Sequence, residues 1–336
     1  MTISMNLGKN SYDILVENGI LNIAKEHLNL NRRVLILTDS GVPKNYAEQL
    51  KAQCKEGIIY TIEQGENSKS LKSFEDILLC MLNNDFSRKD CVVAVGGGVV
   101  GDLAGFVASA YMRGIDFYNI PTTLLSQIDS SIGGKTAVNF GGVKNIVGAF
   151  YQPKKVLIDP NLLNSLSSRQ FNNGLAEAIK MALTSSKELF EILENEDIKS
   201  NINKIIVGSL EIKKRVVEED EKEQGLRKIL NFGHTIGHGI ETTNSNLYHG
   251  ECVALGIIPM CAKEIRARVI ATLKKCNLYN EIKYNWQEIA NKTFHDKKAD
   301  GNLVTITLVN EIGNYQLKTI TCNELIELAK NCLENL

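Results

Sequence analysis

Three of the five histidines in the chain fall within one short segment, at His234, His238 and His249. His234 and His238 are four residues apart in NFGHTIGHGIE, a spacing that places two imidazoles on one face of a helix. Upstream, GLAEAIK places Glu177 and Lys180 three residues apart, again on one helical face. One carboxylate and two imidazoles with an open position make a typical catalytic zinc site. Spacing favours His234 and His238 as the imidazole pair, and it leaves the choice between His238 and His249 open.

A second chemical signal is VVAVGGGVVGDLAGFVAS, in which an apolar segment runs into Gly96, Gly97 and Gly98. A helix is expected to begin near Val99. Glycines at this point let the backbone approach a diphosphate closely, and the helix N-terminus offers free N–H groups. The pattern is neither a GxGxxG fingerprint followed by a distant acid nor a Walker A loop, so an ordinary Rossmann assignment does not fit. A tight strand-to-helix turn without a ligand is the alternative.

Two acidic residues lie where they could bind the hydroxyl groups of a ligand. Asp102 is expected in the first turn of the helix after the glycines, where it could bind a ligand or simply stabilise the helix. Asp39 directly follows the apolar run 33–38, and an acid at that point can accept a pair of ribose hydroxyls. The dipeptide Asp-Ser also begins turns well, so this second signal is weak by itself.

The segment 122–153 combines glycine pairs with lysines. Lys135 follows Gly-Gly directly, and Lys144 and Asn145 follow Gly-Gly-Val. Glycine pairs beside lysines predict flexible turns that present an ammonium group to a phosphate or carboxylate, whereas solvated surface lysines are the alternative. Arg113 precedes a glycine, so it could cap a helix or reach the same anion.

The elements that must position these residues change in type along the chain. In the first half, strand-like runs alternate with helical patterns such as 70–84, and these runs are 33–38, 57–62, 91–95, 116–121 and 155–159. Alternating strands and helices indicate βαβ units and a largely parallel sheet. We therefore expect an α/β nucleotide-binding domain over residues 1–160.

Residues 161–336 are expected to form a mostly α-helical domain that binds the metal and the substrate. The helical pattern extends to about Lys275. Segments 303–309 and 314–320 then predict a hairpin, followed by a final helix from about Asn323. A cleft between two domains is a favoured place for a ligand.

The composition argues against several classes of function. A net charge of −1 gives no overall attraction to nucleic acid or to an anionic membrane, so an anionic substrate needs a local basic pocket. No apolar run is long enough for a transmembrane helix, and no secretory signal is recognisable. The eight cysteines are scattered without a CxxC pair, which indicates reduced thiols in a cytoplasmic protein. The charged run 211–224 is expected to be a solvated helix face, from which single lysines could point inward.

Taken together, these stretches resemble the 3-dehydroquinate synthase family of sugar phosphate cyclases. The matching motifs are GGGVVGDLAGFVAS, RGIDFYNIPTTLLSQIDSSIGGKTAVN, GGVKNIVGAFYQP, GLAEAIK, RKILNFGHTIGHGIE and HGE, in the family's order across most of the chain. The resemblance implies a homodimer that uses NAD and one divalent metal ion, Zn or Co. A small departure is Gly239, where alanine is usual in the family.

The resemblance also implies roles for individual residues. The metal ligands would be Glu177, His234 and His249, which leaves His238 to contact the substrate. The implied NAD contacts are Asp39, Glu66, Lys69, Gly96, Gly97, Gly98, Asp102, Thr122, Thr123, Lys135 and Lys144. The implied catalytic and substrate-binding residues are Arg113, Asp129, Lys135, Asn145, Lys180, Lys213, Arg227, Asn231, His238 and Lys298.

The implied substrate is 3-deoxy-D-arabino-heptulosonate 7-phosphate, in the shikimate pathway of aromatic amino acid biosynthesis. Transient oxidation of a ring hydroxyl by NAD acidifies the neighbouring C–H bond, so that phosphate leaves by β-elimination. The hydride then returns, and an intramolecular aldol step closes 3-dehydroquinate. NAD is therefore catalytic and is not consumed. In this scheme the metal polarises the hydroxyl, and the lysines with Arg113 neutralise the phosphate.

Three other functions compete with this one. A metal- and NAD-dependent polyol dehydrogenase of the related superfamily would share the glycine turn and the metal site, but it would not need Lys135 or the Lys144–Asn145 pair. A cyclase acting on a neutral sugar phosphate would not need Arg227 and Asn231, which suit a carboxylate. A non-enzymatic paralogue would lack ligands or lysines, and none is missing here.

Overall fold

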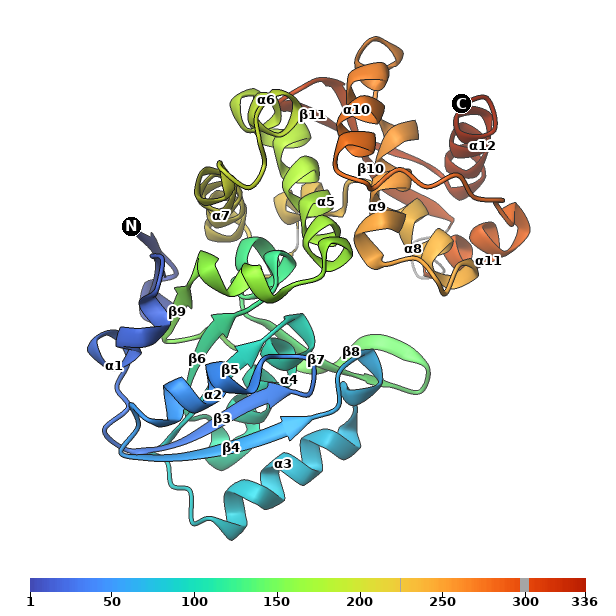
Figure 1. Cartoon of the computed structure of the whole chain (residues 1–336). Coiled ribbons are helices and arrows are strands. Elements are labelled where there is room, and N and C mark those ends of the chain that lie inside the picture. The colour runs from blue at the N-terminus through green and yellow to red at the C-terminus, as the bar shows by residue number, and fades with distance from the viewer. Residues whose placement is uncertain (224, 297–301) are drawn as a thin grey trace. The chain divides into compact units, whose positions relative to one another are not determined.

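The computed structural model describes residues 1–223, 225–296 and 302–336. The chain divides into two compact units, Met1–Ser167 and Ser168–Leu336 (Figure 1). The first unit is an α/β unit with a largely parallel sheet, and the second is mostly helical, so the expected fold class is confirmed. None of the helices in the described ranges combines the length and the apolar character that a membrane span requires.

The first unit is built on a seven-stranded sheet with the strand order β1-β2-β9-β6-β5-β3-β4. Its strands are β1 (Thr2–Met5), β2 (Tyr12–Val16), β3 (Arg33–Asp39), β4 (Glu56–Ile62), β5 (Cys91–Gly96), β6 (Asp116–Pro121) and β9 (Lys155–Ile158). Strands β1 and β2 pair antiparallel, and every other pairing is parallel. All six residues of β5 are buried, which explains its almost wholly apolar sequence, because helices cover both faces of a parallel sheet.

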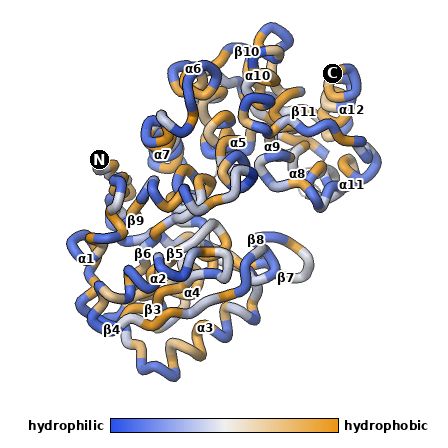
Figure 2. The backbone as a smooth tube through the Cα atoms, in the orientation of Figure 1, coloured by the Kyte–Doolittle hydropathy of each residue, from blue (hydrophilic) through white to orange (hydrophobic). Residues whose placement is uncertain are grey.

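Two hydrophobic clusters fill the space between this sheet and its helices. On one face pack α3 (Leu71–Asn83) and α4 (Gly98–Ala110), and on the other pack α1 (Ala24–His27) and α2 (Lys44–Lys51). Figure 2 shows hydrophobic residues along β3, next to the edge strand β4, in line with the burial of its five middle residues. Packing of helices on both faces thus fixes the positions of the carboxyl ends of the parallel strands.

A separate antiparallel hairpin lies between β6 and β9 in the chain and was not predicted. It consists of β7 (Lys135–Phe140) and β8 (Val143–Phe150), joined by Gly141 and Gly142 with φ of +59° and +78°. Two positive φ angles in a two-residue loop are those of a type I′ turn. Both glycine pairs, 133–134 and 141–142, have positive φ angles, and Lys135 and Lys144 follow them as the first residue of β7 and the second residue of β8. The first four residues of β8 are all exposed, so this part of the strand lacks the alternation of buried and exposed positions that is typical of a strand.

The second unit contains eight α-helices in its described ranges. They are α5 (Ser168–Ser185), α6 (Lys187–Asn195), α7 (Ile202–Glu219), α8 (His234–Thr243), α9 (His249–Ile257), α10 (Lys263–Lys275), α11 (Trp286–Asp296) and α12 (Cys322–Leu333). The predicted hairpin is formed by β10 (Leu303–Glu311) and β11 (Asn314–Thr321). Helix α5 is central, since every residue from Gly174 to Thr184 is buried and the helix contacts α6, α7, α9 and both strands.

Helices α8 and α9 pack with their backbones in close approach. A Cβ atom on Gly256 of α9 would lie 2.1 Å from the carbonyl oxygen of Gly233, and one on Gly237 of α8 would lie 3.0 Å from Cα of Val253. Only glycine allows such an approach. The first residues of these two helices are His234 and His249, so the glycines determine how close the two imidazoles come.

Candidate active site

Helices α5, α8 and α9 bring Glu177, His234 and His249 together. Oε1 of Glu177 lies 3.6 Å from Nε2 of His234 and 3.6 Å from Nε2 of His249. In a tetrahedral zinc site with bonds of 2.0–2.1 Å, two ligand atoms are about 3.3 Å apart. The distance from each imidazole nitrogen to the carboxylate oxygen is thus close to the distance between two ligand atoms of one metal ion.

His238 belongs to the same cluster. The ligand atoms of His234, His238 and His249 all lie within 4.8 Å of one another. The ring centroid of His238 is 5.3 Å from that of His234 and 5.7 Å from that of His249. His238 and His249 thus both lie close to His234, as either of the two pairs considered from the sequence would require. The contacts with Oε1 of Glu177 are made by His234 and His249.

The electrostatics of this cluster suit a cation. Glu177 is 2% exposed, and Oε1 accepts no hydrogen bond of ordinary length from the described residues. Burial opposes its ionisation, but Lys180, His234 and His249 together hold the pKa of Glu177 well below its usual value. Burial, reinforced by Lys180, lowers the pKa of His234 to about 3, so this ring is neutral at pH 7. An ionised carboxylate and a neutral imidazole are the forms that bind a divalent metal ion.

A second acid, which the sequence analysis missed, contacts the other side of His249. Oε2 of Glu241 lies 3.3 Å from Nδ1 of His249. Burial lowers the pKa of His249, but the nearby carboxylates of Glu177 and Glu241 outweigh it and raise this pKa to about 9. Glu241 follows His238 by three residues and His234 by seven, so helical periodicity could have placed it on the histidine face of α8.

Three cationic side chains of this unit are almost fully buried. Lys180 is 2% exposed, Lys213 of α7 is 4% exposed, and Arg227 of the short helical turn Leu226–Asn231 is 2% exposed. Lys180 also pairs with Glu177 one helical turn away. Lys213 is the inward-pointing exception in a charged run that was expected to be solvated. Nη1 of Arg227 donates to the carbonyl oxygen of Glu221 at 2.7 Å. Lysine and arginine side chains are the usual groups that bind anionic ligands.

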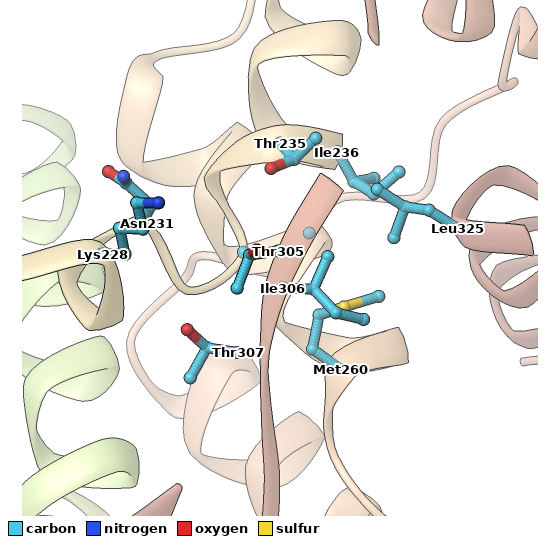
Figure 3. Close-up of a pocket in the computed structure, with 11 residues that line it drawn as sticks. Lys228, Asn231, Thr235, Ile236, Met260, Thr305, Ile306, Thr307 and Leu325 are labelled. Atoms are coloured by element: carbon cyan, nitrogen blue, oxygen red, sulfur yellow. The ribbon is translucent and has the colours of Figure 1, made fainter. Parts of the chain in front are cut away.

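Asn231 lies at the edge of a small cavity of about 10 Å³ (Figure 3). Lys228, from the same helical turn, lies beside it, and Thr305 and Thr307 of β10 contribute their hydroxyl groups to the lining. The amide of Asn231 donates to Oε1 of Glu223 at 3.3 Å. Lys228 was not singled out from the sequence, although it belongs to the motif RKILNFGH.

In the first unit, four predicted ligand contacts lie at one edge of the sheet. Asp39 ends β3, Gly96 ends β5, Thr122 follows β6, and Glu66 begins a short helical turn (Glu66–Ser68) after β4. Strands β4, β3, β5 and β6 are consecutive neighbours and run parallel, so their carboxyl ends lie side by side. Ligands of parallel α/β sheets bind at this edge.

The glycine turn packs tightly against the residues after β6. A Cβ atom on Gly97 would lie 3.2 Å from Cγ2 of Thr123, and one on Gly98 would lie 3.0 Å from Oγ of Ser130. Helix α4 begins at Gly98, one residue earlier than predicted. Asp102 therefore lies beyond the first turn, and the expectation that it belongs to that turn was wrong.

Asp39 takes part in the turn that its sequence suggested. Its Oδ1 accepts the backbone N–H of Gly41 at 2.8 Å. Burial raises the pKa of Asp39, while the N–H groups of Gly41 and Val42 act in the opposite direction. The turn thus holds the carboxylate at the carboxyl end of β3, where a ligand hydroxyl would meet it.

A buried lysine links several of the predicted contacts. Lys69 is 4% exposed, and its ammonium group donates to Asp102 at 2.5 Å and to the side-chain oxygen of Asn145. Asn139 completes the network: its Oδ1 accepts the N–H of Asn145 at 2.9 Å, its Nδ2 donates to Glu66 at 2.8 Å, and its N–H donates to the Lys69 carbonyl at 2.8 Å. The sequence analysis missed Asn139, because nothing in its spacing marks it.

The remaining predicted residues occupy different settings. Lys135 is exposed and lines, with Asp102, a small cavity of about 10 Å³. Asp129 lies in a π-helical turn, Ser126–Ser130, while Lys144 on β8 and Arg113 at the end of the helical turn Tyr111–Arg113 are exposed. Lys298 lies outside the described residues.

Comparison with known proteins points to one family. The model of the N-terminal part of 3-dehydroquinate synthase matches residues 59–173, and that of the C-terminal part matches residues 174–299. A 3-dehydroquinate synthase from Streptococcus sanguinis is 40% identical over 98% of this chain and 100% of its own length. The two matched segments adjoin and together span most of the chain.

Two solved cyclases show the same fold. A 2-deoxy-scyllo-inosose synthase complexed with carbaglucose-6-phosphate, NAD+ and Co2+ has a TM-score of 0.89 at 24% identity, covering 99% of this chain and 100% of that one. The 2-epi-5-epi-valiolone synthase from Streptomyces hygroscopicus subsp. jinggangensis, with NAD+ and Zn2+ bound, has a TM-score of 0.87 at 26% identity, covering 96% and 97%.

Proposed function

Because the chain belongs to the 3-dehydroquinate synthase family, we propose that its described residues hold NAD, one divalent metal ion and 3-deoxy-D-arabino-heptulosonate 7-phosphate. The reaction is that of the family, in which the heptulosonate phosphate is converted to 3-dehydroquinate and phosphate in the shikimate pathway. The family assignment favours this activity over a polyol dehydrogenase. The observation that carries the site proposal is the approach of two imidazole Nε2 atoms to one buried carboxylate oxygen at 3.6 Å.

The proposed metal ligands are Glu177, His234 and His249, and His238 is left to contact the substrate. Carboxylate and imidazole ligands suit zinc or cobalt, and three protein ligands leave a position open. When bound, NAD would accept and return a hydride, while the divalent ion would lower the pKa of the hydroxyl that is oxidised. The residues of this chain bind and orient the substrate for those steps.

In the second unit, the buried cations Lys180, Lys213 and Arg227 are proposed to bind the anionic groups of the substrate. The planar guanidinium of Arg227 is suited to a carboxylate, which it can bind with two parallel hydrogen bonds. Asn231 would add a neutral donor, and the resemblance gives Lys298 a similar role. Together they would hold the sugar acid in one orientation, which lowers the entropic part of the barrier.

In the first unit, the edge formed by β4, β3, β5 and β6 is proposed to bind NAD. The free N–H groups at the start of α4, after Gly96 and Gly97, suit the diphosphate. Asp39 and Glu66 would accept ribose hydroxyls, and Lys69 with Asp102 would border the nucleotide. The remaining proposed contacts are Gly98, Thr122, Thr123, Lys135 and Lys144.

The phosphate that leaves during the reaction requires cationic and neutral donors. Lys135, Asn145 and Arg113 are proposed to bind it, and Asp129 is proposed as a further active-site acid. In this division, residues 1–160 bind NAD and residues 161–336 bind the metal and most of the substrate. We also propose that the protein is a homodimer. We further propose that it resides in the cytoplasm, where thiols stay reduced, which suits its eight free cysteines.

One assay tests this function. The purified protein is incubated with trace NAD, Co2+ or Zn2+ and the heptulosonate phosphate, and phosphate release and carbocycle formation are followed together. We expect many turnovers per NAD and no net NADH. Net NADH formation with a polyol would favour a dehydrogenase, and turnover of glucose 6-phosphate in place of the sugar acid would favour a cyclase for neutral sugars.

A further inference from the structure

Glu241 contacts the His249 ring on the side opposite to Glu177. Its Oε2 lies 3.3 Å from Nδ1, whereas Oε1 of Glu177 lies 3.6 Å from Nε2 of the same ring. A neutral imidazole carries its proton on one nitrogen and a lone pair on the other. A metal ion binds the ring in its neutral form, and an ionised carboxylate only accepts hydrogen bonds. Glu241 would therefore keep the remaining proton on Nδ1 and leave the Nε2 lone pair on the side of Glu177.

His234 has the same arrangement with a main-chain acceptor. Its Nδ1 lies 3.2 Å from the carbonyl oxygen of Phe232, and its Nε2 faces Glu177 at 3.6 Å. Metal-binding histidines regularly donate their second ring N–H to a carboxylate or a carbonyl, which fixes the tautomer and the orientation of the ring. Both rings therefore present the same nitrogen to one point, one through the main chain and one through Glu241.

The backbone at the start of α9 is anchored by contacts that do not involve Glu241. Oδ1 of Asn173 accepts the N–H of Gly250 at 2.6 Å, and Glu251 is bound to Arg169 at 2.7 Å. The acid and the imidazole of the Glu241 pair are 22% and 32% exposed, so their contact is not part of the core. Removing this carboxylate should release the ring without displacing the helix that bears it.

We propose that Glu241 is a positioning residue of the metal site, which increases metal affinity by fixing the proton and the orientation of His249. The inference rests on the proposed function, because the ligand role of His249 is part of it. The carboxylate also adds negative charge near a point where Lys180 offsets the charge of Glu177. Loss of such an outer contact typically lowers metal affinity about 10- to 100-fold.

The test is a titration of the metal-free full-length protein with Co2+ in competition with a chromophoric chelator. Glu241→Gln keeps an acceptor oxygen without the charge, and Glu241→Leu removes both. Glu194→Gln is the matched control, because this carboxylate is 18% exposed and bound to Arg268, and it lies on α6. The visible spectrum of bound Co2+ and the melting temperature of each metal-free variant are recorded in parallel.

We expect the Kd for Co2+ to rise about 10-fold in Glu241→Gln and up to about 100-fold in Glu241→Leu. It should stay at the wild-type value in Glu194→Gln. The Co2+ spectrum should change in both Glu241 variants, while their metal-free melting temperatures stay close to that of the wild type. A pure structural role would move the melting temperature instead.

Two results separate this inference from the proposal on which it rests. Wild-type Co2+ affinity in Glu241→Leu, together with lost binding in His249→Ala, would overturn the role of Glu241 and leave the metal site intact. A marked fall of the metal-free melting temperature in both Glu241 variants would also overturn it. Failure of the wild-type protein to bind Co2+ would reject the ligand assignment itself, and the inference with it.

Discussion

The side-chain amide of Asn139 donates a hydrogen bond to the carboxylate of Glu66, with 2.8 Å between Nδ2 and Oε1. The same amide accepts the N–H of Asn145 through Oδ1 at 2.9 Å. One side chain thus joins the segment after β4 to strand β8, and both segments carry proposed NAD contacts. Asn139 is therefore a suitable place to test the nucleotide site without removing a proposed contact.

Asn139→Leu should weaken NAD binding about tenfold. It removes two hydrogen bonds that each contribute about 0.5–1.5 kcal/mol, and about 1.4 kcal/mol corresponds to a factor of ten. Calorimetric titration with NAD measures the change in NAD affinity. The affinity of the variant for Co2+ should stay at the wild-type value. Asn84→Leu, which removes a bond to the Cys80 carbonyl at the end of α3, is the control. Unchanged NAD affinity in Asn139→Leu would show that the network does not support the nucleotide.

Lys135→Ala should lower turnover more than it lowers NAD binding. The ammonium group is proposed to neutralise the substrate phosphate, and a hydrogen bond to a charged group is worth about 1.5–3 kcal/mol. We expect kcat/KM to fall about 10- to 100-fold, measured by phosphate release, while the Kd for NAD changes by a smaller factor. Losses of equal size in both quantities would assign Lys135 to the nucleotide alone.

His249→Ala should abolish turnover and metal retention while the protein stays folded. The backbone of α9 keeps its anchors to Asn173 and Arg169, so circular dichroism should match that of the wild type. A metal ion at 100 times its Kd stabilises the wild-type protein by about 2.7 kcal/mol, and this gain should be missing in the variant. Full metal content in purified His249→Ala would remove this residue from the ligand set.

The pair of Glu194 and Arg268 gives a prediction on pH. Two hydrogen bonds from the guanidinium, at 2.8 and 2.6 Å, hold the pKa of Glu194 below its usual value. A carboxyl whose pKa is lower in the folded state stabilises the fold above the unfolded pKa of about 4.3, and this contribution disappears as the pH falls through the lowered folded value. Because the pair is partly exposed, we expect at most about 1 kcal/mol.

Arg268→Gln should therefore be less stable than the wild type at neutral pH, by a margin that shrinks in acid. Urea denaturation of both proteins at about pH 7 and about pH 3 gives the four free energies of unfolding. A margin of equal size at both pH values would mean that ionised Glu194 is not its source.

The sequence predicted those parts of the molecule in which local pattern and burial agree. The apolar run at Cys91–Gly96 and the helical spacing of Leu71–Asn83 both gave correct elements. Strand β8 was missed because its exposed residues lack alternation, and β1 and β2 were missed because their alternating pattern extends over only four and five residues. Strand β2 also pairs with β9, which lies far along the chain, and a local pattern does not contain such a contact.

The site was predictable to a similar extent. Spacing alone identified the histidine segment, but it favoured His238 over His249 as the partner of His234. The approach of His249 depends on the path of residues 244–248 and on the packing of α9, neither of which spacing encodes. Family resemblance supplied that choice, while the contact of Glu241 with His249 and the hydrogen bonds of Asn139 became visible in the structure. The structure also explains why glycine stands at position 239 in place of the family's usual alanine, since a Cβ atom there would lie 2.8 Å from Cγ2 of Ile289.

The close approach of α8 and α9 has a consequence for protein engineering. Exchanging helical glycines for alanine is a common way to make an enzyme more heat-resistant, with gains of about 0.4–1 kcal/mol per position. At Gly256 the added methyl group would collide with the main chain of the neighbouring helix. Gly256→Ala would therefore force apart the two helices that bear the imidazoles. A variant made more heat-resistant in this way would bind its metal more weakly.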